Sequence, residues 1–311
     1  MKSPLPLRAG VSPSRVYLPP GPWGQLIDFL VERFPHLPRA ILLQRLSVGD
    51  IVDEEGRPQR ADSRYRANGW LWYYREVPNE VPVPFDLPVL HRDSRLLAVD
   101  KPHFMASTPG GRHLHHTALV RLRHTLGLPH LSPMHRLDRE TAGVLLFCID
   151  PAYRGRYQAL FQDRNVYKEY EGVAVLPSNL ELPMVRRSRL QEVEGRFVMR
   201  EVPGEPNSET RIELIAPLDR GIEGSPRMLG WYRLLPVTGR KHQLRVHMCS
   251  LGVPLLNDAL YGNPSTVPAD DDFSHPLQLL ARCVEFRDPV DGKMHRFVSQ
   301  RQLEVVARWK R

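Results

Sequence analysis

The stretch MHRLDRETAGVLLF, residues 134–147, joins a dense run of charges directly to an apolar segment. From Gly143 onward its composition is typical of a buried strand. Turns at the ends of strands favour Gly, Asn or Pro, but here Asp138 lies between Arg136 and Arg139. The two cations should favour the ionised carboxylate, which can act as a nucleophile or a base. The alternative is a surface salt-bridge cluster at a turn.

Length and composition place the chain among globular proteins. Its 311 residues suffice for two domains, and 41% are hydrophobic and 25% charged. No apolar run reaches about 18–20 residues, the length of a membrane-spanning helix, and the N-terminus lacks the apolar core of a secretory signal. The three cysteines contain no CxxC pair, which argues against a disulfide framework and a cysteine zinc site. We therefore expect a cytoplasmic protein without membrane association.

The net charge of +8 favours an anionic partner, and nucleic acid is the commonest one. Ordinary solubility charge is the alternative. Residues 24–78 contain as many acidic residues as arginines, so the excess lies elsewhere. The larger C-terminal part is thus the better electrostatic candidate for RNA contact.

Composition divides the chain into four segments. The first is a Pro-rich lead-in, residues 1–23, which we expect to be extended and poorly ordered. A small α/β module follows at 24–78, then a Pro-rich, semi-rigid linker at 79–88. The large domain covers 89–311. In the small module, apolar spacing predicts helices at 24–34 and 39–49, a strand and turn at 50–59, and a strand at 70–77.

The large domain mixes both kinds of element. Apolar patterns predict helices at 115–127, 151–162 and 241–252, and strands at 94–102, 143–150, 168–176, 209–218, 230–239, 277–286, 294–299 and 303–309. Several neighbouring strands are joined without a helix between them, so a doubly wound parallel sheet is excluded. We expect an α+β fold with a mixed, largely antiparallel central sheet flanked by helices and loops.

A second charged segment is VTGRKHQLRVHMCSLGVPLLNDALYG, residues 237–262. Thr238 and Gly239 indicate a strand end followed by a helix start, and Arg240, Lys241 and His242 follow at once. Lys241 and Arg245 are four residues apart and would share one helix face. A cationic helix start is a natural phosphate site. An ordinary amphipathic helix with a solvated basic face is the alternative.

A third segment, YKEYEGVAV, alternates in the manner of a strand. Lys168 and Tyr170 should share one face, where Tyr170 can stack on a base; a half-exposed strand residue is the alternative. The segment GGRHLHHT, residues 110–117, has three histidines but no carboxylate or cysteine at metal-ligand spacing, so we interpret it as a loop. No phosphate-binding glycine motif is present, and no nucleotide cofactor is expected.

In this order the segments resemble the RluA-type pseudouridine synthases, which act on ribosomal or transfer RNA. The resemblance covers nearly all of residues 85–311. It is carried by His135–Asp138 (HRLD) with Thr141 and Gly143, by Lys168-x-Tyr170, by Thr238–His247 (TGRKHQLRVH), by Gly252, Pro254, Asp258, Tyr261 and Gly262, and by Val99–Pro102 (VDKP). The small module resembles a degenerate S4-like RNA-binding domain, but Leu37-Pro38-Arg39 and residues 53–56 depart from its usual pattern, as Leu280 departs from the family's histidine.

The resemblance implies a monomeric enzyme that isomerises specific uridines to pseudouridine without a cofactor. Asp138 would be the essential carboxylate, Arg245 its partner, and Tyr170 the ring that stacks on the flipped uracil. Arg136 would fill the gap left by that base. Further RNA contacts would come from His135, Arg139, Lys168, Arg240, Lys241 and His242.

Two other functions fit parts of the pattern. A non-catalytic RNA-binding or ribosome-assembly factor could use the same scaffold, although the intact Asp138 argues against it. A glycosidase would need a second acidic residue near Asp138, and Glu140 is the only obvious candidate.

Overall fold

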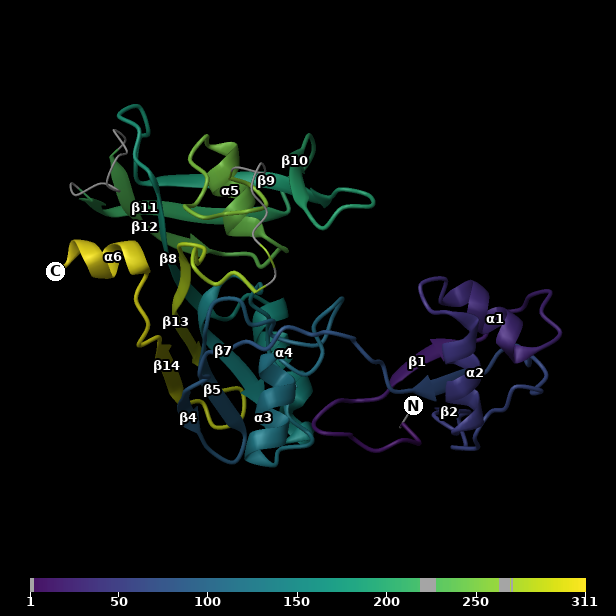
Figure 1. Cartoon of the computed structure of the whole chain (residues 1–311). Helices are drawn as coiled ribbons and strands as arrows, with labels where there is room; N and C mark the ends of the chain where they lie inside the picture. Colours follow the sequence, from purple (N-terminus) through teal and green to yellow (C-terminus); the bar gives the residue numbers. More distant parts are fainter. Residues whose placement is uncertain (1–2, 219–227, 263–268, 270) are drawn as a thin grey trace. The chain divides into compact units, whose positions relative to one another are not determined.

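The computed structural model describes residues 3–218, 228–262, 269 and 271–311. The chain divides into two compact units, which are described separately (Figure 1). The smaller comprises Met1–Glu80 with Arg123–Pro129, and the larger Val81–Leu122 with His130–Arg311. No helix of the described residues is long and apolar enough to cross a membrane.

The small unit packs two helices on a three-stranded antiparallel sheet with the order β1-β3-β2. Its elements are β1 (Ser14–Tyr17), α1 (Leu26–Arg33), α2 (Arg39–Ser47), β2 (Ile51–Val52) and β3 (Trp70–Tyr73). The prediction of a poorly ordered lead-in is wrong for β1, which pairs along its length with β3. Val16 joins the apolar core because alternate strand residues face the helices. The S4-like assignment stays a prediction.

The large unit is built on one sheet of eleven strands, in the order β10-β9-β11-β12-β8-β13-β7-β5-β4, with β14 beside β13 and β6 beside β7. Among the strand pairs of the described residues only β13 and β7 are parallel, so the predicted α+β fold with a largely antiparallel sheet is confirmed. The strands are β4 (Val89–Arg92), β5 (Leu96–Lys101), β6 (Ser132–Pro133), β7 (Ala142–Cys148), β8 (Tyr167–Val175), β9 (Met184–Glu192), β10 (Met199–Val202), β11 (Ser208–Leu218), β12 (Leu229–Pro236), β13 (Leu279–Arg287) and β14 (Met294–Val298).

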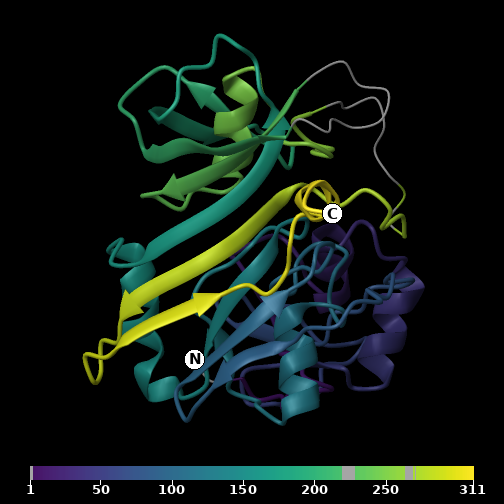
Figure 2. The ribbon, with the colours of Figure 1, turned by 90° about the vertical axis from the view of Figure 1, so that its left-hand side faces the viewer.

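Helices cover the two halves of this sheet, and β8 and β13 run through its middle (Figures 1 and 2). The helices are α3 (Ala118–Leu126), η1 (Pro151–Tyr153), α4 (Arg154–Gln162), α5 (Gln243–Ser250) and α6 (Glu304–Trp309). On one half, Leu244 and Met248 of α5 pack against Ile212 and Leu234. On the other, Tyr157 of α4 belongs to the core that β7 crosses. Thus α5 and the start of β7 are each fixed by their own apolar contacts.

Two local predictions need correction. The C-terminal strand predicted at 303–309 is helix α6, in which Leu303 and Val306, three residues apart, are buried together on one face. Apolar patterns predict no strand between residues 177 and 208, but β9 and β10 lie there. The Pro-rich linker contains no helix or strand, and Arg121 donates to the carbonyls of Val83 and Phe85, so the second half of the linker is held in place.

Candidate active site

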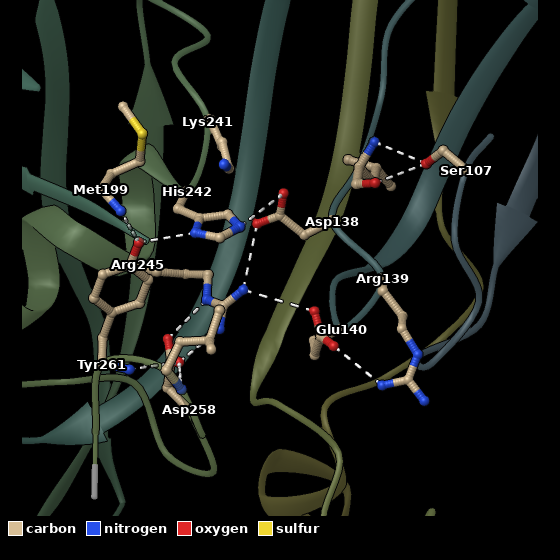
Figure 3. Close-up of polar contacts among 12 residues, drawn as sticks. Ser107, Asp138, Arg139, Glu140, Met199, Lys241, His242, Arg245, Asp258 and Tyr261 are labelled. Atoms are coloured by element: carbon tan, nitrogen blue, oxygen red, sulfur yellow. Dashed lines mark hydrogen bonds and ion pairs between the residues drawn. The ribbon is translucent and has the colours of Figure 1, made fainter. Parts of the chain in front are cut away.

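Asp138 lies in the loop between β6 and β7. Before it, one hydroxyl fixes the backbone of Leu137 on both sides: Ser107 Oγ donates to the Leu137 carbonyl at 2.7 Å and accepts from its N–H at 3.0 Å. The Leu137 side chain is buried. Asp138 points away from Ser107, towards His242 and Arg245 (Figure 3). Its side chain is 27% exposed, so the carboxylate is both held and accessible.

The second residue of the strand that follows this loop must be a glycine. Gly143 has a φ of +113°, and a Cβ there would lie 2.2 Å from the carbonyl oxygen of Ala281 in β13. Thr141, two residues earlier, donates its N–H to the Asp138 carbonyl at 3.2 Å. The Asp138 turn therefore closes directly against the sheet, which limits its movement.

Lys101, at the end of β5, is buried and donates hydrogen bonds to the same loop and to the segment after β5. Its Nζ donates to the carbonyls of Pro102 at 2.9 Å, Met105 at 2.7 Å and Arg139 at 3.2 Å. Three acceptors match the three N–H groups of an ammonium. Complete burial lowers the pKa of Lys101 to about 7, although Glu140 opposes this shift.

His135 connects the loop to the middle of β7. Its Nε2 accepts from the N–H of Leu146 at 3.2 Å, and its ring stacks on Phe161 with centroids 4.5 Å apart. Burial lowers the pKa of His135 to about 3, which agrees with a neutral, accepting nitrogen. These contacts make His135 a support for the loop, and its contact with RNA stays a prediction.

Arg245 provides the cation nearest to the Asp138 carboxylate. Its hydrogen bonds go to Asp258: Nε and Nη2 donate to the two carboxylate oxygens at 2.8 and 2.7 Å. Nη1 lies 3.6 Å from Asp138 Oδ2 and 3.7 Å from Glu140 Oε2 (Figure 3). Burial alone would lower the pKa of Arg245, but Asp258, followed by Asp138 and Glu140, raises it well above its usual value. The guanidinium stays charged, and its fork is oriented by Asp258.

Glu140 does not have the character of a glycosidase acid. Burial by itself would raise its pKa, but Arg245 and Arg139 outweigh burial and lower it. Arg139 Nη1 is 3.2 Å from its carboxylate. A general acid would need a raised pKa, so the second carboxylate near Asp138 is an ion-pair partner.

Strand β8 brings the second motif to the site. Burial and then the charge of Asp138 raise the pKa of Tyr170 above its usual range, so its phenol stays protonated at neutral pH and can donate a proton or a hydrogen bond. Lys168, on the same strand, donates from Nζ to the Thr238 carbonyl at 3.1 Å. Burial and then Arg164 lower the pKa of Lys168 to about 8. The K-x-Y and TGR segments, distant in sequence, thus meet here.

The predicted start of helix α5 is wrong. The helix begins at Gln243, whose Oε1 accepts from Thr238 Oγ1 at 2.7 Å and from the N–H of Arg240 at 3.0 Å. This side chain closes residues 238–242 into a loop. Lys241 therefore precedes the helix and shares no helix face with Arg245.

The predicted basic contacts divide into exposed and buried residues. Arg136 and Arg240 are exposed. Lys241 is half-buried, with its Nζ 3.2 Å from Glu192 and 4.1 Å above the Phe197 ring. His242 is only 4% exposed, and its Nε2 lies 3.9 Å from Asp138 Oδ1, so it is not available as a surface phosphate contact.

Sequence reasoning missed several residues that build this site. Asp258, Tyr261 and Lys101 stood inside motifs that carried the resemblance, but nothing in their spacing pointed to Arg245, His242 or the Asp138 loop. Ser107 gave no signal, because a single serine acquires its role only through the distant Leu137 backbone. Among the described residues, no group of three or more His, Cys, Asp or Glu side chains is arranged to hold a metal ion.

Comparison with known proteins assigns a family to this arrangement. Residues 95–250 match the family model described as RNA pseudouridylate synthase. An uncharacterized RNA pseudouridine synthase of Synechocystis sp. is 32% identical over 81% of this chain and 84% of its own length. The dual-specificity RNA pseudouridine synthase RluA of Haemophilus influenzae is 32% identical over 57% of this chain and 78% of its own length.

Solved structures agree on the fold. Human RNA pseudouridylate synthase domain containing 1 is similar with a TM-score of 0.56 at 23% identity, over 70% of this chain and 84% of that one. Human RNA pseudouridylate synthase domain containing 4 has a TM-score of 0.51 at 24% identity, over 70% of this chain and 90% of that one.

The chain therefore belongs to the RNA pseudouridylate synthase family. Within this family it is of the RluA type, an RNA-modifying isomerase.

Proposed function

We propose that the chain isomerises specific uridines in ribosomal or transfer RNA, with Asp138 as the essential carboxylate and without a cofactor. The observation that carries this proposal is the meeting of three distant segments around one partly exposed carboxylate. Asp138 lies 3.6 Å from Arg245, and burial, followed by the charge of Asp138, raises the pKa of Tyr170. The dual specificity in the name of the Haemophilus influenzae relative supports both RNA classes as candidates.

The reaction replaces the bond between C1′ and N1 of uridine by one between C1′ and C5, and the proton on C5 is lost. The target base must leave its stack to reach Asp138. In our proposal Tyr170 stacks on the flipped uracil and, since its phenol stays protonated, donates a hydrogen bond. Arg136, exposed beside Asp138, fills the gap in the RNA.

In this proposal the phosphate contacts come from one exposed and two half-buried cations. Arg240, which is exposed, and Lys241 lie on the loop before α5, and Lys168 lies on β8. Arg139 adds a further charge beside Glu140, whereas His135 acts by supporting the loop. The monomeric state and the cytoplasmic location stay predictions.

The proposal is tested with transcripts of ribosomal and transfer RNA made in vitro, which contain no pseudouridine. We expect the wild type to form it at defined positions, mapped by carbodiimide treatment and primer extension. Asp138→Asn should abolish the product and leave RNA binding near normal, while Asp163→Asn, at the exposed end of α4, should behave as wild type. Undiminished product from Asp138→Asn would refute the role of this carboxylate.

A further inference from the structure

The buried His242 and the half-buried Tyr261 have no role in the proposed function described above. His242 Nδ1 and Tyr261 Oη are 2.8 Å apart, and the Met199 N–H donates to the same Oη at 2.7 Å (Figure 3). A backbone N–H can only donate, so Oη accepts from Met199 and its own proton is free for His242. The direction of these two bonds makes Nδ1 the acceptor.

This direction determines the tautomer of His242. A neutral imidazole whose Nδ1 accepts carries its proton on Nε2. Nε2 points at Asp138 Oδ1, 3.9 Å away, while Arg245 Nη1 points at Oδ2, 3.6 Å away. One N–H donor therefore faces each oxygen of the carboxylate. Both distances exceed a hydrogen bond, which leaves Asp138 oriented without being fully engaged.

The backbone supports a functional role for this position. His242 has a φ of 54°, in the left-handed region, although it is not a glycine. Strained backbone of this kind tends to occur where a side chain must be aimed. The Phe197 ring also packs edge-on against the imidazole, with centroids 5.3 Å apart. The ring of His242 is thus held by its contacts with Tyr261 and Phe197.

We propose that Tyr261 and Met199 fix His242 as the Nε2–H tautomer, so that His242 is a positioning residue that presents a second N–H donor, beside Arg245, to the Asp138 carboxylate. The inference rests on the proposed function of Asp138 and deepens it. In this role His242 contacts neither the RNA backbone nor a metal. It sets which way the carboxylate faces when the uridine arrives.

The charged environment agrees with a neutral His242. Asp138 and Glu140 face it from the loop before β7, Arg245 from α5, Lys241 from its own loop, and Tyr261 from the segment after α5. Burial lowers the pKa of His242, Asp138 opposes this, and Arg245 and Lys241 add to it. At neutral pH the imidazole therefore has one proton, whose position Tyr261 determines.

Two substitutions of His242 distinguish the role of Nε2 from that of Nδ1. Gln reaches the place of Nε2 and can still donate to Asp138, whereas Asn reaches only the place of Nδ1. The rate is measured as tritium release from a 5-³H-uridine transcript that the wild type modifies. We expect kcat to fall roughly 10- to 100-fold in His242→Asn and clearly less in His242→Gln, with KM little changed. Asn suits a left-handed backbone better than Gln, so a purely structural role predicts the opposite order.

Tyr261→Phe keeps the ring but removes the proton donor to Nδ1. The proton can then move to Nδ1 and leave a lone pair on Nε2 against Asp138, whereas an imidazolium restores the donor. The ratio of variant to wild-type kcat should therefore fall as pH rises through the pKa of His242, which burial lowers below the ordinary value of histidine. A ratio that is independent of pH, or equal rates in His242→Asn and His242→Gln, would overturn the proposal.

Nitrogen-15 NMR of the wild-type histidine side chains tests the tautomer of His242 directly. This measurement does not require any variant to be active. The His242 signal is assigned by its loss in His242→Gln. A proton on Nε2 supports the inference, and a proton on Nδ1 overturns it. If the wild type released no tritium from any transcript, the proposed function would fail, and the NMR result would still decide the tautomer.

Discussion

Two histidines of one motif have opposite roles, and their surroundings explain why. The His242 region consists of His242, Tyr261 and Asp138, and there Nε2 faces a partly exposed carboxylate at 3.9 Å. The His247 region, five residues later, consists of His247 with Ser188, Ser208 and Thr210. Its Nε2 lies 3.0 Å from Ser208 Oγ and its Nδ1 2.9 Å from Thr210 Oγ1.

The bond directions in the His247 region lead to the same tautomer. Ser208 Oγ donates to the Ser188 carbonyl and so accepts from His247 Nε2, while Thr210 Oγ1 accepts from Gln243 and so donates to Nδ1. Both nitrogens are thus satisfied by hydroxyls of β9 and β11, and the imidazole ties α5 to the sheet. Substitutions in the His242 region should therefore change activity most, and those in the His247 region stability most.

After Asp138→Asn, the largest effect is expected from Asp258→Asn, which removes the charge that orients Arg245. The guanidinium fork would then turn towards Asp138 and Glu140 and engage the carboxylate that we propose is essential. We expect kcat to fall about 100-fold, as small displacements of catalytic groups can do. Weakening this buried pair should also cost about 3 kcal/mol of stability. Tritium release and thermal unfolding measure the two effects.

If Asp258→Asn kept wild-type kcat, activity would not depend on the orientation that Asp258 gives to Arg245. The expectation that groups around Asp138 determine activity would then be weakened. Asp163→Asn is again the control for a carboxylate without a buried partner.

A smaller loss is expected from Lys101→Met, which leaves three buried carbonyls without their donor. Each such group costs about 1–3 kcal/mol. The loop of Asp138 should loosen, so we expect kcat to fall roughly tenfold together with a clear drop in Tm. Ser107→Ala, which loses only the two bonds to Leu137, should lie between Lys101→Met and the wild type. A loss of Tm without any loss of kcat would show that the loop does not depend on Lys101 for its geometry.

A pH effect on stability is expected in the His247 region. Burial, with a contribution from Arg186 and against one from Glu201, lowers the pKa of His247 to about 4. Between about pH 6.5 and 4 the unfolded chain binds a proton that the folded chain does not, so this residue contributes stability above pH 6.5 that is lost as pH falls towards 4. His247→Gln should lower Tm at pH 7, flatten the decline of Tm over this range, and change kcat less than threefold. If the decline of Tm between pH 6.5 and 4 were the same in His247→Gln as in the wild type, His247 would not be the source of this pH effect.

The smallest effect is expected from Arg136→Ala, since this side chain is exposed and holds no part of the fold. Removing one phosphate or base contact should weaken RNA binding several-fold and reduce the slope of log affinity against log salt by about 0.7–0.9. Tm should not change. Arg287→Ala, an exposed arginine at the end of β13, serves as the control. Equal salt slopes for both variants would place Arg136 outside the RNA interface.

Much of this molecule could be predicted from its sequence. Apolar alternation located most strands, and the gaps without helices predicted an antiparallel sheet. Two of the failures have one cause, since β1 and α6 lie in short segments where propensity is weak and tertiary packing decides. The nine-residue strand β9 was also not predicted. Val16 becomes a core residue only because β3 pairs beside it. The start of α5 was misplaced because the Gln243 side chain, rather than helix propensity, closes the preceding loop.

By itself, the sequence determined the residue types of the site and their order: an acid among cations at the mouth of a buried strand, a tyrosine on a strand, and a basic stretch before a helix. Only the tertiary structure determined which of these residues form hydrogen bonds and ion pairs with one another. It gave the hydrogen bonds of Arg245 to Asp258 and left Asp138 with ion pairs, and it turned His242 inward and Arg136 outward. The physical reason is that hydrogen bonds and charges act over a few ångströms between atoms that are far apart along the chain. Spacing in sequence restricts which residues can be functional, but the direction of each donor is set by the folded neighbours.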